Sequence, residues 1–88
     1  MVNNIDRAEW AAHALQRFSD STSHGQIDEH SIGDLICDLG HYAEIELALP
    51  RTEILAIFSV GIGAWLAESG DPLGEPKCNK YVTINIED

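Results

Sequence analysis

Four side chains of types that bind metal ions lie close together in the sequence. Asp34, Cys37, Asp38 and His41 are spaced at i, i+3, i+4 and i+7, so an α-helix would place them on one face. The preceding segment adds further ligand types: His24, Asp28, Glu29 and His30. A helix and a loop together can supply the four ligands of a zinc site. Such spacings also arise by coincidence in an acid-rich chain, and Cys37 can pack as a small hydrophobe. We therefore predict no metal and no cofactor. Should a metal bind, the candidate ligands are Asp34, Cys37, Asp38 and His41.

The sequence lacks the short motifs of nucleotide-binding loops, serine hydrolases, zinc proteases and EF-hands. Gly61-Ile62-Gly63 lies inside an apolar run, where it does not resemble a phosphate-binding loop. No nucleophile and base can be paired from their spacing. These observations predict a protein that is not an enzyme.

Three helices are expected to position these residues. Apolar side chains recur at helical spacing, with Ser31 as the cap of the second helix and Pro50 at the start of the third. Alternating apolar residues then predict a C-terminal β-strand, which needs a partner. The ranges are 5–20, 31–48 and 51–69 for the helices and 81–86 for the strand.

The third helix and the strand both point to association. The helix is apolar on nearly all sides, which is typical of a central or shared helix. The strand can pair with the N-terminus or with the same strand of a second subunit. We therefore predict a mostly α, three-helix domain over residues 1–88 that forms a homodimer. The expected interface residues are Ile57, Phe58, Gly61, Trp65, Val82 and Ile84.

Length and composition limit the number of domains and the cellular location that we expect. Eighty-eight residues allow one domain. The N-terminus has no signal-peptide pattern, and the longest apolar stretch, 54–66, is shorter than a membrane span. We therefore expect a cytoplasmic protein that does not bind membranes, with Cys37 and Cys78 reduced.

The net charge of −10 is the most unusual property of the chain. Residues 18–76 hold eleven acids and one base, Arg51, so the imbalance lies entirely there. This charge argues against direct nucleic-acid binding, which needs basic residues. It favours a basic protein surface as the partner, although charge that only keeps the protein soluble is the alternative. The expected contact residues are Asp28, Glu29, Asp34, Asp38, Glu44 and Glu46.

The run from Asp34 to Ala43, together with segments 7–10 and 14–18, resembles small phage- and plasmid-borne bacterial proteins of no established activity. Those proteins carry a DLxxDLxHxA-like helix followed by a helix that begins at proline. The resemblance covers residues 7–68 and departs after Leu49, where this chain is more apolar. It implies a mobile-element origin, and with the charge it suggests an inhibitor of the anti-CRISPR or anti-restriction type. Such an inhibitor would occupy a basic, nucleic-acid-binding surface of a host defence protein.

A fainter similarity is to the all-α MazG-type nucleotide pyrophosphohydrolases, which hold magnesium through ExxE and ExxD pairs. Here Glu9 has no second acid at that spacing, and Asp34 and Asp38 are four residues apart rather than three. The similarity implies a metal-dependent nucleotide hydrolase as one alternative function. A purely structural dimerisation module is the other.

Overall fold

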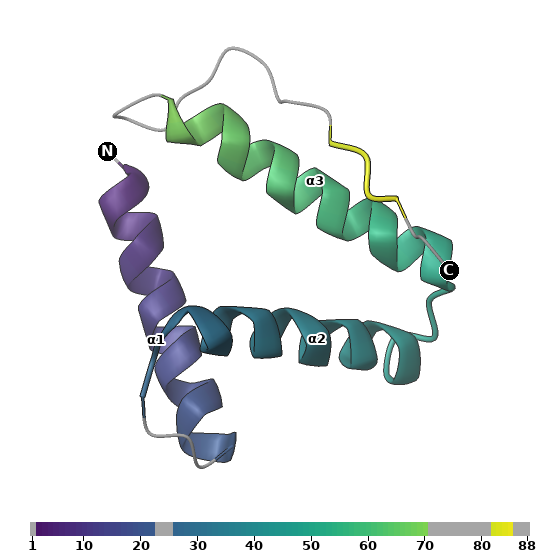
Figure 1. The fold of residues 1–88 in the computed structure, drawn as a ribbon, viewed down its shortest axis with the longest axis horizontal. Coiled ribbons are helices and arrows are strands. Elements are labelled where there is room, and N and C mark those ends of the chain that lie inside the picture. Colours follow the sequence, from purple (N-terminus) through teal and green to yellow (C-terminus); the bar gives the residue numbers. More distant parts are fainter. Residues whose placement is uncertain (1, 23–25, 71–81, 86–88) are drawn as a thin grey trace. The chain divides into compact units, whose positions relative to one another are not determined.

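The computed structural model describes residues 2–22, 26–70 and 82–85. Over these residues the protein is mostly α, with helices α1 (Asn4–Thr22), α2 (Glu29–Ile45) and α3 (Arg51–Ser69) in that order (Figure 1). The predicted three-helix, mostly α fold is confirmed. The helix ends differ by at most three residues from those expected from the sequence.

The chain divides into two compact units, each described by itself. One comprises Ile5–Ala48 and contains almost all of α1 together with α2. The other comprises Met1–Asn4 and Leu49–Asp88 and contains α3. In the second unit the side-chain amide of Asn4 donates to the carbonyl oxygen of Glu68 at 3.0 Å, which also accepts from the backbone N–H of Gly70, so the N-terminus adds a donor at the end of α3.

A polar junction links α1 to α2. Ser19 and Ser31 are both buried, with 1% and 7% of their surface exposed. Their hydroxyl groups donate to the same acceptor, the carbonyl oxygen of Gln26, at 3.4 and 3.1 Å. Because serine is small and its hydroxyl is satisfied here, the end of α1 can lie against the start of α2 without an unpaired buried polar group.

The hydrogen bonds at the end of α2 show why this helix ends earlier than expected. The backbone N–H groups of Glu46 and Leu47 both donate to the carbonyl oxygen of Tyr42, at 2.8 and 3.3 Å. Ala48 then adopts a left-handed conformation, with φ of 53°. This turn ends the helix at Ile45, before Pro50, and Pro50 becomes the residue that precedes α3.

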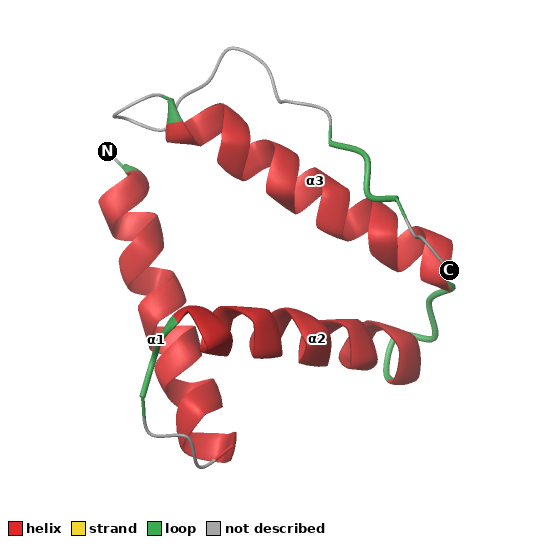
Figure 2. Ribbon diagram, in the orientation of Figure 1, coloured by secondary structure: helices red, strands yellow, loops and turns green. Residues whose placement is uncertain are grey.

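The predicted C-terminal strand is wrong for the part of it that lies among the described residues. Residues 82–85 form a loop, drawn in green in Figure 2. Val82 and Ile84 are half-buried while Thr83 and Asn85 are exposed, so the expected alternation of faces is present. A strand also needs a hydrogen-bonded neighbour, and no other described residue forms a backbone hydrogen bond with residues 82–85. The ends of the predicted strand, residues 81 and 86, lie outside the described residues.

Candidate functional site

A capping box fixes the start of α2, the helix that carries most of the candidate residues. Asp28 is the N-cap, and its carboxylate accepts from the backbone N–H groups of His30 and Ser31 at 2.9 and 3.2 Å. In return, the Ser31 hydroxyl accepts from the backbone N–H of Asp28 at 3.2 Å. The sequence-based choice of Ser31 as the cap is therefore wrong, because Ser31 occupies the third helical position of the box.

The cap also affects the titration of Asp28. The hydrogen bond from the backbone N–H of Ser31 is the largest influence and holds the pKa of Asp28 below its usual value. Desolvation acts in the opposite direction, and the hydrogen bond from His30 and the charge of its ring lower the pKa further. Asp28 was expected to contact a partner, but in this structure its carboxylate already stabilises the helix.

All six expected partner-binding carboxylates are exposed. No lysine or arginine lies between residues 26 and 50, and the ion pair found near these acids joins Glu29 to His30 at 3.9 Å. Glu44 lies in the last turn of α2 and Glu46 is its C-cap, where the helix dipole disfavours negative charge. None of the three helices has a basic residue in its last turn. The acidic surface is therefore uncompensated within the described part of the chain.

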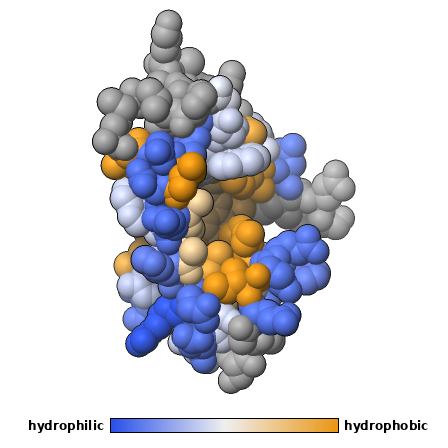
Figure 3. All heavy atoms as spheres, turned by 90° about the vertical axis from the view of Figure 1, so that its left-hand side faces the viewer, coloured by the Kyte–Doolittle hydropathy of each residue, from blue (hydrophilic) through white to orange (hydrophobic). Residues whose placement is uncertain are grey.

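Apolar side chains are also widely exposed (Figure 3). Among the residues that the structure describes, Ile54 is the one buried hydrophobic side chain, with 7% exposed. A single chain with so small a core leaves apolar surface that a folded protein normally covers. The exposed large hydrophobic residues are Val2, Ile5, Trp10, Ile27, Ile32, Ile36, Leu39, Tyr42, Ile45, Leu47, Ile57, Val60, Ile62, Trp65 and Leu66.

Three of the expected interface residues form an exposed stripe on α3. Ile57, Gly61 and Trp65 are spaced at i, i+4 and i+8 and are all exposed, Trp65 by 63%. A side chain added at Gly61 would meet no atom of the described residues within 4 Å, so none of them requires glycine there. The other expected interface residues, Phe58, Val82 and Ile84, are half-buried.

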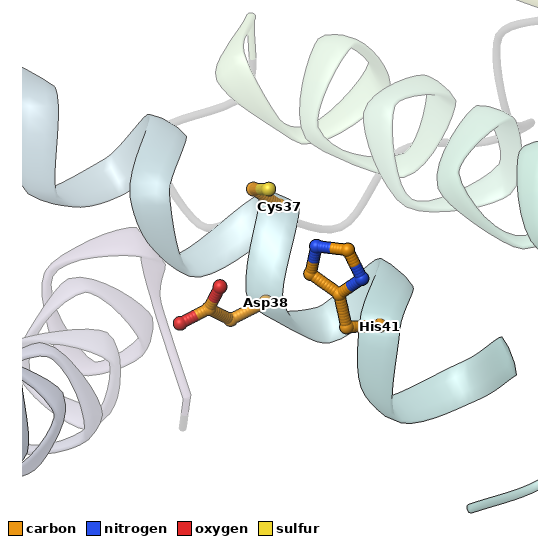
Figure 4. Close-up of side chains that lie close together, drawn as sticks. All are labelled: Cys37, Asp38 and His41. Carbon is orange, nitrogen blue, oxygen red and sulfur yellow. The ribbon is translucent and has the colours of Figure 1, made fainter. Parts of the chain in front are cut away.

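The structure brings together three of the four metal-ligand candidates on α2. One ligand atom from each of Cys37, Asp38 and His41 lies within 4.8 Å of the other two, and all three residues are exposed (Figure 4). Cys37 is exposed, so the alternative that it packs as a buried hydrophobe is wrong, and its thiol is free. Asp34 and Glu9 do not belong to this group. The carboxylate set expected for a MazG-type magnesium site is therefore not assembled among the described residues.

No protein-family model, curated protein or solved structure matches the chain. Among the described helices, α3 is long and apolar enough to cross a membrane, judged by length and composition alone.

Proposed function

We propose that this chain is a non-enzymatic binding protein whose acidic helix α2 docks on a basic protein surface. The supporting observation is the set of exposed carboxylates along and beside α2 that has no lysine or arginine within residues 26–50. Opposite charge across an interface steers encounter and fixes register. In this proposal the surface is one that otherwise binds nucleic acid, and the chain comes from a mobile element and blocks a host defence protein.

Asp34 and Asp38 offer the sharpest test of this proposal. Both are exposed, and neither takes part in the cap of α2. Replacing each with lysine turns an attraction of about 1 kcal/mol per close pair into a repulsion of similar size. We therefore expect the double variant to lose at least about tenfold in affinity for the basic partner.

The measurement is displacement of labelled DNA from host DNA-binding proteins by the purified chain. We expect displacement at about 0.15 M salt. Direct binding of the chain to the same proteins is measured without DNA, which itself dissociates at high salt, and should be lost at about 1 M, where screening shortens the Debye length to about 3 Å. The matched control replaces Glu9 and Asp20 of α1 with lysine, which changes the net charge equally on another helix. Equal displacement by the two double variants contradicts the proposal, as does direct binding that is insensitive to salt.

The exposed stripe on α3 favours a second, structural proposal: two copies associate through Ile57, Gly61 and Trp65. An exposed tryptophan beside a glycine is suited to close helix packing, because the glycine lets a second backbone approach. Sedimentation at several concentrations should show a dimer, and Trp65→Glu should convert it to a monomer. Leu66→Glu is the matched control, because residue 66 lies on the opposite side of α3. A native chain that stays monomeric at every concentration contradicts this proposal.

A further inference from the structure

We propose that Cys37, Asp38 and His41 form a surface site for a divalent transition-metal ion such as Zn²⁺ or Co²⁺. The three residues supply a sulfur, an oxygen and a nitrogen ligand, which is a set that zinc accepts. A thiolate ligand makes the hard cations Mg²⁺ and Ca²⁺ poor occupants of the site. The site needs neither a basic partner nor a second copy, although it shares Asp38 with the proposed partner contact.

Helix geometry holds the three ligands together. Cys37 and His41 are four residues apart and Asp38 and His41 three apart, so each pair projects from adjacent turns of α2. Figure 4 shows the imidazole of His41 beside the thiol of Cys37, whereas the carboxylate of Asp38 points to the left in this view, away from the imidazole, and must turn toward it to share an ion.

The distances fit coordination after small side-chain rotations. Bond lengths of about 2.3 Å to sulfur and 2.0–2.1 Å to nitrogen place two tetrahedral ligands about 3.5 Å apart. The ligand atoms already lie within 4.8 Å of one another, so each must move by about 1 Å or less. All three side chains are exposed, and in the described part of the chain none of them is engaged in an ion pair or hydrogen bond that the metal would have to break. Three protein ligands leave the fourth position to water.

Binding has two chemical consequences. Because the metal takes the thiolate form of Cys37, the thiol proton is released to solvent when the ion binds. The bound ion also joins two turns of α2, so it stabilises the folded chain in proportion to the logarithm of its free concentration. The first consequence predicts stronger binding at higher pH, and the second predicts a metal-dependent melting temperature.

The test is a titration of the full chain with Co²⁺, with Cys78→Ser as the background so that Cys37 is the one thiol present. We expect a cobalt–thiolate charge-transfer band that reaches its end point at one ion per chain and is displaced by Zn²⁺. In the same background, Cys37→Ser should abolish the band, and His41→Gln should weaken binding by about tenfold or more. Asp34→Asn is the control, because it removes the same charge as Asp38→Asn from a residue outside the group.

Two results overturn the proposal. One is that the Cys78→Ser chain, in which Cys37, Asp38 and His41 are intact, shows no charge-transfer band at millimolar Co²⁺. The other is equal Co²⁺ affinity in Asp34→Asn, Asp38→Asn and His41→Gln, which would show that any thiolate bond forms without the helical group. Circular dichroism of each variant checks that α2 is intact, so that a lost site is not mistaken for a lost fold.

Discussion

Replacement of Ser31 with alanine tests the reasoning about how α2 is positioned. The Ser31 hydroxyl is buried, accepts from the backbone N–H of Asp28 at 3.2 Å and donates to the carbonyl of Gln26 at 3.1 Å. Loss of the capping-box hydrogen bond from the Asp28 N–H costs about 1 kcal/mol, and loss of the hydrogen bond to the Gln26 carbonyl costs about another 1 kcal/mol. The higher helix propensity of alanine offsets about 0.5 kcal/mol of this loss in the free energy of unfolding.

The expected net loss is therefore about 1.5 kcal/mol in the free energy of unfolding. For a domain of this size, that loss lowers the melting temperature by roughly 6–12 °C. Urea denaturation followed by circular dichroism measures the loss directly.

The matched control is Ser21→Ala. The hydroxyl of Ser21 is exposed and bonds only to the carbonyl of Arg17, one turn earlier in α1, at 3.0 Å. Its removal should change the free energy of unfolding by no more than about 0.5 kcal/mol. If Ser31→Ala costs no more than this control, the capping box does not stabilise the start of α2 and the reasoning is refuted.

Three further predictions address other parts of the chain. Ala48→Gly should stabilise the protein by about 0.5–1 kcal/mol in urea denaturation, because the left-handed φ of 53° is costly for alanine and free for glycine. The pKa of Asp28 is lower when the chain is folded, so its contribution to stability is present at neutral pH and is lost as the pH falls below about 4. Asp28→Asn, which keeps the cap acceptor, should remove that part of the acid sensitivity in pH-dependent denaturation. Ile57→Asp should shift sedimentation toward the monomer, as is expected of Trp65→Glu, whereas an unchanged dimer would exclude the α3 stripe as its interface.

The sequence predicted the helices well where their ends carry unambiguous signals. The start and end of α3 follow from Pro50 and Gly70. The start of α2 was misplaced because Asp28 and Ser31 are both good capping residues and lie three apart, so the pattern alone does not decide which is the cap. The misplaced end of α2 depends on the left-handed conformation of Ala48, a residue type that rarely adopts it.

The arrangement of the candidate metal ligands could likewise be predicted only in part from the sequence. Helical spacing fixed the proximity of Cys37, Asp38 and His41, because residues three and four apart on a helix are neighbours in any fold. Spacing could not show that Asp34 falls outside the group, since side-chain rotamers decide that. Nor could it show whether Cys37 is buried, because burial depends on what packs against the helix.

The geometry of α2 limits which of its exposed side chains one partner can cover. At about 100° per residue, Asp34 and Asp38 lie on the side of the helix opposite to Ile32, Ile36 and Leu39. The apolar side chains are nevertheless about half exposed. A single flat partner surface therefore cannot cover Asp34 and Asp38 together with these apolar side chains. If a basic protein binds the acidic side, a different apolar surface must cover the other side, and the two contacts should respond separately to salt and to apolar substitutions.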